Sequence, residues 1–480
     1  MNAGRTPSAV QFGTDGWRAA IADTYTFDNV RLAAQGSAEY FKSSGVGARG
    51  VAVGFDTRFG SDRFARAVAE VLAANGIHVQ LSDRFQPTPV ISYSILDRKL
   101  GGAVIVTASH NPATDNGFKV KSAAGASAPP EVIADIEAAI DRIEAGELKI
   151  LRMPFDEALS SGQVELFDAT PAYDAQIARL VDLERLRGAG IKVVADSMYG
   201  TGQGYFKRLL SGGTTDVIEI RNMVNPAFPG IAPEPIRPHI DELCRVVVER
   251  DAGLGLATDG DSDRIGAVTE QGEFVNQHQV FGLLALYLTE QRGLRGPAVR
   301  SVTMTSMADQ YLEQLGEQVF ETPVGFKFIG GTMVAENALL GGEESGGFGF
   351  RGHLPERDAI VAGLFLVDLM VRLGRPMSGV MAYLREKLGD WHYLRYDARY
   401  PAAERDAIWQ RVAEAKPSDL DGSPVASVGT RDGYKYYAQD GSWLLLRFSG
   451  TEPLLRIYTE TTSPERVQRL LKQGRALAGV

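Results

Sequence analysis

The sequence predicts α/β domains with largely parallel sheets over most of its length, followed by a smaller α+β domain. Short apolar runs recur along the first half, and each ends in polar, turn-forming residues, at 51–55, 103–106, 191–195 and 254–257. Helical patterns lie between them, as at 61–76 and 131–145. Strands that alternate with helices favour α/β domains. After Pro401 the pattern changes to a helix, alternating strands and a final helix, which favours α+β.

Length and composition agree with a globular protein of several domains. The chain has 480 residues, which correspond to roughly three domains and accommodate four. Hydrophobic residues make up 44% and charged residues 23%, and these ordinary values exclude a mainly disordered chain or a disulfide scaffold. Stretches that lose periodicity predict four domains, at 1–155, 156–270, 271–390 and 391–480.

Charge and cysteine content limit the partners. The net charge of −10 argues against a broad nucleic-acid-binding surface. Cys244 is the single cysteine, so an intramolecular disulfide is excluded. No apolar run approaches the ~20 residues that cross a bilayer, and residues 1–7 lack the apolar stretch of a signal peptide. We therefore expect a cytoplasmic protein with neither nucleic acid nor membrane as a partner.

The strongest chemical signal is the run Asp-Gly-Asp-Ser-Asp-Arg at residues 259–264. Alternate side chains of an extended segment point the same way, so the three carboxylates are expected to converge. Converging carboxylates repel one another, and a hard divalent cation such as Mg²⁺ relieves that repulsion. Arg264 adds a cation that could hold a phosphate beside the metal.

Two other interpretations compete for the same run. The aspartates fit the first ligand positions of an EF-hand and Glu270 fits the last, but the required glycine is replaced by Arg264. Residues 254–257 also indicate a strand where an EF-hand has a helix. A solvated acidic turn would explain a single Asp-Gly, whereas three alternating aspartates followed by arginine favour metal binding.

A second signal is the run Thr-Ala-Ser-His-Asn-Pro at residues 107–112, directly after an apolar run. A serine at a strand end beside a histidine suits a nucleophile or a phosphate carrier. A helix N-cap followed by an Asn-Pro turn explains the same residues without chemistry. The hexapeptide alone favours the N-cap, but the aspartate run favours Ser109 as a phosphate carrier, because a phosphoserine needs a divalent cation.

Three further segments combine glycine with charged or hydroxyl side chains. Residues 447–453, with Arg456 just beyond, make either a phosphate cradle or an ordinary hairpin turn. Residues 341–347 hold two acids and a serine among glycines and could bind sugar hydroxyls, with Lys327 nearby. Residues 12–18 form a glycine-rich loop that carries Arg18 towards a ligand or is simply a hairpin.

Together these segments resemble the α-D-phosphohexomutase family (phosphoglucomutase/phosphomannomutase). Five motifs occur in the family's order, at residues 12–18, 107–112, 259–264, 342–346 and 447–453. The resemblance implies four domains around a central cleft. Three related α/β domains would have mixed, largely parallel sheets, and the fourth would be a smaller α+β domain.

The resemblance also implies a role for each matched residue. Ser109 would carry the phosphoryl group, and Mg²⁺ would be bound by Ser109, Asp259, Asp261 and Asp263. The implied catalytic residues are Ser109, His110, Lys119, Arg18 and Arg264. The implied substrate contacts are Lys327, Glu343, Ser345, His353, Arg357, Arg447, Ser449, Gly450, Thr451 and Arg456.

One position departs from the family pattern. Several branches have a histidine directly after the Ser-Gly of the sugar loop, and here that position is Gly347. We expect His353 to serve instead, with Arg357 as a further contact.

The implied reaction is reversible phosphoryl transfer between the 1- and 6-positions of a hexose phosphate, through phospho-Ser109 and a hexose 1,6-bisphosphate. Lys119 or His110 would take the sugar proton, and neighbouring arginine would lower the pKa of such a lysine. The amino-sugar branch usually has Gln where Glu344 stands, so this loop resembles the glucose- and mannose-active members and does not distinguish those two. Glucose phosphate is expected first.

Other interpretations stay open at this point. Mannose or glucosamine phosphate could be the substrate, and the protein could be a monomer or a homodimer. A sugar-phosphate-binding relative without catalysis and a Mg²⁺-dependent phosphatase are the alternatives from other classes.

Overall fold

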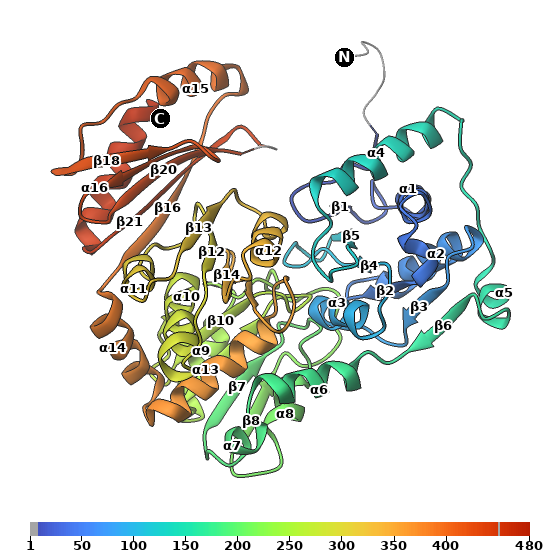
Figure 1. The fold of residues 1–480 in the computed structure, drawn as a ribbon, viewed down its shortest axis with the longest axis horizontal. Coiled ribbons are helices and arrows are strands. Elements are labelled where there is room, and N and C mark those ends of the chain that lie inside the picture. The colour runs from blue at the N-terminus through green and yellow to red at the C-terminus, as the bar shows by residue number, and fades with distance from the viewer. Residues whose placement is uncertain (1–7, 450–451) are drawn as a thin grey trace.

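Four β-sheets follow one another along the chain, and each carries its own helices (Figure 1). The computed structural model describes residues 8–449 and 452–480. The first three sheets mix parallel and antiparallel strands between helical layers, whereas the fourth is antiparallel throughout. The predicted fold class, three α/β domains and a C-terminal α+β domain, is confirmed.

The first sheet has the order β1-β5-β4-β2-β3-β6. Its strands are β1 (Trp17–Ala20), β2 (Val51–Phe55), β3 (Val79–Ser82), β4 (Ala103–Val106), β5 (Asp115–Lys121) and β6 (Val164–Phe167). Its helices are α1 (Phe27–Ser43), the 3₁₀ helix η1 (Val46–Arg49), α2 (Ser61–Ala74), α3 (Thr88–Asp97), α4 (Pro130–Glu144) and α5 (Phe155–Ser160). β6 lies beyond the predicted boundary at residue 155, yet it pairs in parallel with β3.

Burial on both faces explains why β4 is an unbroken apolar run. Val104 and Val106 pack on the side of α1 and α2, whereas Ala103 and Ile105 pack on the opposite side. Successive residues of a strand point to opposite faces, so a strand covered by helices on both faces has no polar position. The polar residues after the run therefore mark where the strand leaves the core.

The second sheet has the order β11-β10-β9-β7-β8. Its strands are β7 (Lys192–Asp196), β8 (Asp216–Ile220), β9 (Leu254–Thr258), β10 (Ile265–Thr269) and β11 (Phe274–Val275). The associated helices are α6 (Thr170–Leu180), α7 (Leu183–Arg187), α8 (Tyr205–Leu210) and α9 (Asp241–Glu249).

The third sheet has the order β13-β12-β14-β15. Its strands are β12 (Ala298–Ser301), β13 (Val319–Thr322), β14 (Leu340–Gly342) and β15 (Phe348–Phe350). Its helices are α10 (Gln277–Leu286), the π-helix η2 (Tyr287–Gln291), α11 (Asp309–Gln314), α12 (Phe326–Ala335), α13 (Ala359–Leu373) and α14 (Met377–Leu388). One apolar core joins parts of the first three sheets, and α13 packs on β9 and β10 of the second.

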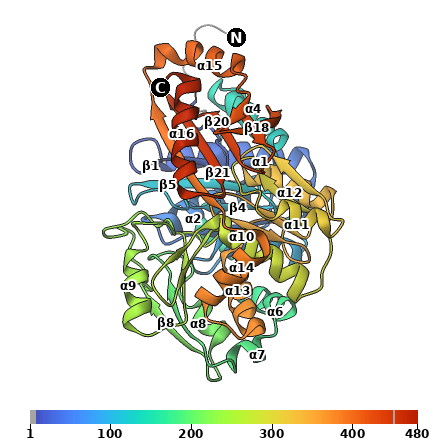
Figure 2. The same cartoon turned by 90° about the vertical axis from the view of Figure 1, so that its left-hand side faces the viewer.

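The fourth sheet has the order β16-β21-β20-β19-β18-β17. Its strands are β16 (His392–Arg399), β17 (Asp419–Leu420), β18 (Ser423–Gly429), β19 (Tyr434–Ala438), β20 (Trp443–Phe448) and β21 (Leu454–Thr461). The 3₁₀ helix η3 (Ala402–Glu404) and the helices α15 (Arg405–Glu414) and α16 (Pro464–Ala478) complete it. Figure 2 shows α16 lying along this sheet, where it packs on β16, β20 and β21.

The fourth domain has a core of its own and meets the third through a different face. Leu444 and Leu446 belong to the core under the helices. Trp443 and Leu445 point the other way and pack with Val302 of the third domain. The alternation along β20 therefore divides one strand between the domain's core and its docking surface.

A buried charge network surrounds that docking surface. Lys435 on β19 donates to the carboxylate of Glu321 at 2.9 Å, and Arg300 on β12 binds the same carboxylate. Burial raises the pKa of Glu321, but Lys435 and Arg300 outweigh it and bring the pKa to about 2. The fourth domain thus meets the third through a charge network as well as an apolar contact, whereas the first three domains share one apolar core.

Among the residues that the structure describes, no helix combines the length and apolar character needed to cross a membrane.

We expect the docking of the fourth domain to weaken in acid. The lowered pKa of Glu321 contributes stability above its unfolded value of about 4.5, and this is lost as the pH falls towards 2. Glu321→Gln should therefore lower the free energy of unfolding at pH 7 by up to about 3 kcal/mol and flatten the acid dependence. Urea unfolding between pH 7 and pH 3 measures both effects. Glu404→Gln, at an exposed position, is the matched control; equal curves for both variants would contradict the prediction.

Candidate active site

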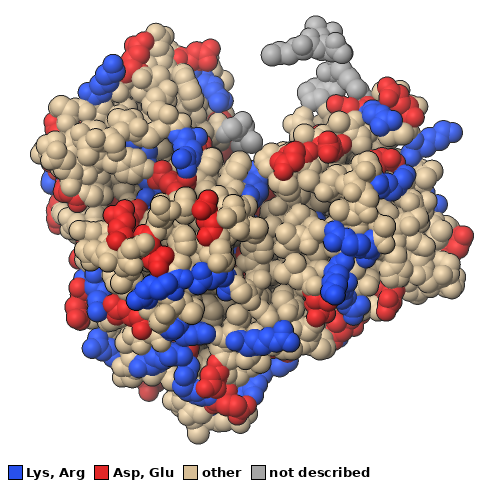
Figure 3. Space-filling model, in the orientation of Figure 1, with Lys and Arg blue, Asp and Glu red and all other residues tan. Residues whose placement is uncertain are grey.

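A cleft of about 720 Å³ lies where the four domains meet. Figure 3 shows the molecule hollowed between the lobe that carries the fourth sheet and the lobe that carries the first. Its lining includes Asp15, Arg18 and His110 from the first domain, Arg264 from the second, Glu343, Ser345 and Arg357 from the third, and Arg395 and Arg456 from the fourth.

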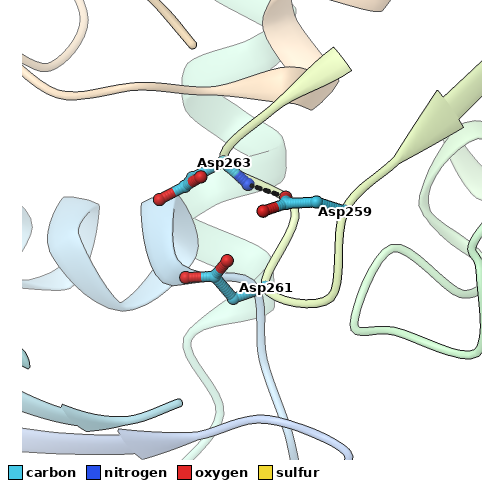
Figure 4. Close-up of side chains that lie close together, drawn as sticks. All are labelled: Asp259, Asp261 and Asp263. Carbon is cyan, nitrogen blue, oxygen red and sulfur yellow. Dashed lines mark hydrogen bonds between the residues drawn. The ribbon is translucent and has the colours of Figure 1, made fainter. Parts of the chain in front are cut away.

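Asp259, Asp261 and Asp263 lie on the turn between β9 and β10, and their carboxyl groups face a common space (Figure 4). The expected extended segment is wrong, because residues 259–264 form a turn in which Ser262 has φ of 58°. The carboxylate Oδ1 of Asp259 accepts the backbone N–H groups of Asp263 at 2.9 Å and of Arg264 at 3.0 Å. The convergence thus comes from a folded turn rather than from strand alternation.

The donor set fits a divalent cation. One oxygen from each aspartate lies within 4.8 Å of the others, and all three residues are fully buried. The Oδ2 atoms of Asp261 and Asp263 accept hydrogen bonds, whereas their Oδ1 atoms are buried without a hydrogen-bond partner. Burial and the other two carboxylates raise the pKa of Asp259 well above its usual value. Hard oxygen ligands with unmatched negative charge are what Mg²⁺ binds in proteins.

Ser109 lies directly against this acidic turn. Its hydroxyl donates to Oδ2 of Asp259 at 2.7 Å, although the two residues are 150 positions apart. Ser109 has φ of 54°, an unusual conformation for a residue other than glycine. Gly260 makes the approach possible, because a Cβ there would lie 2.4 Å from the carbonyl oxygen of Ser109.

Arg58 holds the serine loop and was not predicted. Its guanidinium is fully buried and donates to four backbone carbonyl oxygens, those of Ser109, Asn111, Pro112 and Asp115, at 2.6–3.0 Å. A planar fork with five N–H donors can satisfy four carbonyls at once, which an ammonium cannot. The sequence feature that could have indicated this role is the position of Arg58 in the polar cluster directly after β2.

Lys119 and His110 differ in what they can do. Lys119 donates to Asp261 at 2.7 Å and to Asp263 at 3.1 Å. Burial lowers the pKa of Lys119, but Asp15, Asp261 and Asp263 outweigh it, so the expected lowering is wrong and the pKa is raised. Burial, Arg264 and Arg18 lower the pKa of His110, whose Nδ1 lies 3.5 Å from the Ser109 hydroxyl.

Arg357 bridges three acidic groups at the floor of the cleft. It donates to Asp263 at 2.8 Å, to Glu343 at 3.3 Å and also to Asp15. A Cβ at Gly347 would lie 2.0 Å from Cδ of Arg357, so a larger residue at 347 and this arginine exclude each other. The aliphatic part of the Arg357 side chain therefore fills the space that a histidine at 347 would need. Asp15 was not predicted as a site residue, although it lies within the glycine-rich motif at residues 12–18.

The sugar loop presents its acids to the cleft in different ways. Ser345 donates to Glu343 at 2.9 Å, and both line the cleft. Glu344 accepts from Tyr393 of the fourth domain at 3.0 Å, and burial raises the pKa of Glu344. Glu344 therefore links two domains, while Glu343 and Ser345 stay available to a ligand.

Two predicted substrate contacts lie elsewhere. His353 is buried with its Nε2 2.8 Å from Asp358, and its ring stacks on Tyr93. His353 is not among the residues that line the cleft, and its partner Asp358 is the N-cap of α13, so the structure does not place it where the family's histidine was expected. Lys327 does not line the cleft; its ammonium lies 5.4 Å from the centre of the Phe328 ring.

The phosphate loop joins β20 to β21, and the strand register places Arg447 opposite Arg456. Arg456 lines the cleft, whereas Arg447 is paired with Asp432 at 3.0 Å. The same Asp432 oxygen accepts the backbone N–H of Val324 in the third domain. Ser449 accepts the backbone N–H of Glu452 at 3.3 Å. Gly450 and Thr451 lie outside the described residues.

Cations gather at the two ends of the cleft. Arg18, which donates to Asn111 at 2.8 Å, and Arg264 stand near Ser109. Arg395 of the fourth domain joins Arg456 in the cleft lining and was missed by sequence reasoning. It lies in an aromatic and charged stretch that contains no recognisable motif.

Comparisons with known proteins identify the class. Four family models of phosphoglucomutase/phosphomannomutase match in order: α/β/α domain I over residues 9–147, domain II over 171–272, domain III over 276–388 and the C-terminal domain over 401–476. These matches and the geometry of the site show that the chain belongs to the α-D-phosphohexomutase family. It is thus an isomerase of carbohydrate metabolism that moves a phosphoryl group on a sugar phosphate.

Individual relatives differ in the sugar they are named for. The phosphoglucosamine mutase of Salinispora tropica is 30% identical over 433 residues, which cover 89% of this chain and 90% of the relative. The phosphoglucomutase of Komagataeibacter xylinus is 28% identical, covering 94% and 87%. A crystal structure from Thermus thermophilus, described as a candidate phosphomannomutase, superposes with a TM-score of 0.84 at 34% identity, covering 99% and 100%.

The close approach of the two central loops yields a prediction. Gly260→Ala should force the acidic turn away from Ser109 and lower kcat by about 100-fold, with about 1–3 kcal/mol lost in stability. Steady-state kinetics and urea unfolding measure the two effects. Gly331→Ala is the control, because nothing lies within 4 Å of a Cβ there; unchanged turnover in Gly260→Ala would show that the approach is not needed.

Proposed function

We propose that the protein interconverts the 1- and 6-phosphates of a hexose, with glucose as the preferred sugar, through a phosphorylated Ser109. The observation that carries the proposal is the 2.7 Å contact between the Ser109 hydroxyl and Asp259, beside a cleft with arginines at both ends. A hydroxyl that alternately carries and returns a phosphoryl group needs cations at the reacting end. A second phosphate on the same sugar needs another anion site at a distance.

Different residues of the chain have different roles in the phosphoryl transfer. The sugar hydroxyl attacks phosphorus, the bond from phosphorus to the Ser109 oxygen breaks, and that oxygen regains a proton. His110 lies 3.5 Å from the Ser109 hydroxyl and lines the cleft, so we assign it the role of taking the proton of the attacking hydroxyl and returning it to the Ser109 oxygen. Mg²⁺ bound by the three aspartates would neutralise charge on the transferring group. Arg18 and Arg264 would hold its remaining oxygens.

The far end of the cleft holds the phosphate that does not react. Arg456 and Arg395 supply guanidiniums there, and Arg447 stands opposite Arg456 on the neighbouring strand. A hexose 1,6-bisphosphate that reverses its ends between these two sites returns its other phosphate to Ser109. The 1-phosphate and the 6-phosphate then interconvert through two transfers of the same kind, one from Ser109 and one back to it.

The position of Arg357 favours a substrate whose sugar carries no charged amine. Its guanidinium lies in the cleft lining, 3.3 Å from the Glu343 carboxylate that would bind sugar hydroxyls. A fixed cation beside that carboxylate disfavours the protonated amine of glucosamine phosphate and leaves glucose or mannose phosphate unaffected. Glucosamine 1-phosphate remains the second candidate, because several relatives are named for it.

Loss of the serine tests the covalent step. Ser109→Ala should lower mutase turnover by at least about 10⁴-fold, while calorimetry still detects binding of glucose 1-phosphate. Intact-mass measurement should find one phosphoryl group on the wild type and none on the variant. Ser160→Ala, at an exposed position, is the control. Full turnover in Ser109→Ala would remove the covalent mechanism, and binding with no turnover in either protein would favour the non-catalytic alternative.

A substrate panel tests the sugar assignment. We expect kcat/KM for glucose 1-phosphate to exceed that for glucosamine 1-phosphate by about tenfold or more, which corresponds to about 1.4 kcal/mol. Coupled assays of glucose, mannose and glucosamine 1-phosphates measure the order. A preference for the amino sugar would overturn the assignment to glucose without touching the phosphoserine mechanism.

A further inference from the structure

A second cavity, of about 800 Å³, lies apart from the cleft and shares no lining residue with it. It is formed by α6, α7, α8, α13 and Arg292 at the end of η2, where the segment that joins the first two sheets packs against the third domain. Six arginines line it and no lysine does: Arg179, Arg185, Arg187, Arg208, Arg292 and Arg372. In Figure 3, blue side chains gather low on this face, over the region where Figure 1 places α7, α8 and α13.

Two of the six arginines are neutralised by acids of the same wall. Arg208 binds Asp174 at 2.8 Å, and Arg187 binds Glu184 at 2.8 Å. The third lining acid, Asp182, accepts a backbone N–H of α7 as its N-cap. Four guanidiniums are then left without an acidic lining side chain of their own.

Two of these four, Arg185 and Arg372, bind a single buried carboxylate beneath the cavity. Asp368, which is fully buried, accepts from Arg185 at 2.6 Å, from Arg372 at 2.9 Å and from Tyr287 at 2.7 Å. Arg292 donates to the same tyrosine hydroxyl and to the carbonyl oxygen of Leu180, both neutral groups. Nε of Arg185 is buried with no hydrogen-bond partner. The floor of the cavity therefore holds three guanidinium groups and one carboxylate, so its net charge is positive.

Arg179 adds a cation that has no acidic partner. It lies in the last turn of α6, is exposed, and makes no ion pair with any residue of 8–449 or 452–480. Arginine presents a planar fork that matches the oxygens of phosphates and carboxylates, whereas lysine is a point charge. The exclusive use of arginine indicates recognition of an oxyanion rather than general attraction of negative charge.

We propose that this cavity is a second ligand site, which binds a small phosphorylated anion with two or more negative charges. The volume of the cavity is in the range of small-molecule sites. Helices enclose it, so its dimensions suit a small ligand rather than a nucleic acid strand. The anion would bridge Arg179 on α6 to Arg292 and Arg372 on the third domain. It would thereby clamp the connection between the first two sheets against α13. The site is independent of the phosphoryl transfer at Ser109.

Hydrogen–deuterium exchange with inorganic pyrophosphate, on the enzyme with magnesium in excess of the probe, tests the proposal. We expect protection of residues 170–187 and 359–373 in addition to any protection in the cleft. Arg179→Glu should raise the concentration needed for that protection roughly tenfold, because it removes a charge-assisted bond and adds a repulsive charge. Mutase turnover without pyrophosphate should be unchanged.

Arg49→Glu is the matched control, since Arg49 is exposed on the 3₁₀ helix η1 of the first domain and the charge change is identical. Protection that Arg179→Glu weakens and Arg49→Glu does not would support the site. Protection confined to the cleft, or an equal response of the two variants, would overturn it. Arg292→Gln is a second variant that tests the same site independently, because Arg292 has no carboxylate partner among the described residues.

Discussion

The structure depends on one electrostatic problem, which is how to hold three carboxylates in a fully buried space. Asp259, Asp261 and Asp263 are each inaccessible to solvent, and such a group of like charges is unfavourable unless it is compensated. Lys119 from the first domain and Arg357 from the third provide that compensation through the outer oxygens. The inner oxygens of Asp261 and Asp263 remain for a metal ion. The first and third domains therefore meet at this turn, because each supplies a cation that the turn lacks.

The same arrangement explains the composition of the sugar loop. Arg357 reaches Asp263, Asp15 and Glu343 only because position 347 has no side chain. A histidine at 347 and an arginine at 357 would compete for one volume, so the departure at 347 and the cation at 357 form a single structural choice. This choice places a permanent positive charge where other branches of the family have a group that can titrate.

The four domains are not joined alike. The first three share apolar core, so their relative placement is fixed by packing. The fourth keeps its own core and meets the third through a small apolar contact and a network of charged groups around Glu321. Asp432 links this docking surface to Arg447 of the phosphate loop. The position of the fourth domain and the availability of that arginine are consequently coupled through one carboxylate.

The sequence by itself determined the alternation of strands and helices, the grouping of the three aspartates, the serine motif and the family, because each rests on residue types and spacings within a few positions. It did not determine that Lys119 is paired with aspartates more than 140 residues away, that His353 serves α13, or that Arg58 holds the serine loop. Only the tertiary structure decided these, because hydrogen bonds and charges between distant segments leave no periodic trace in the chain. The turn at 259–264 shows the division within one motif: the residue types predicted the metal site, while the folded geometry supplied a different reason for their convergence.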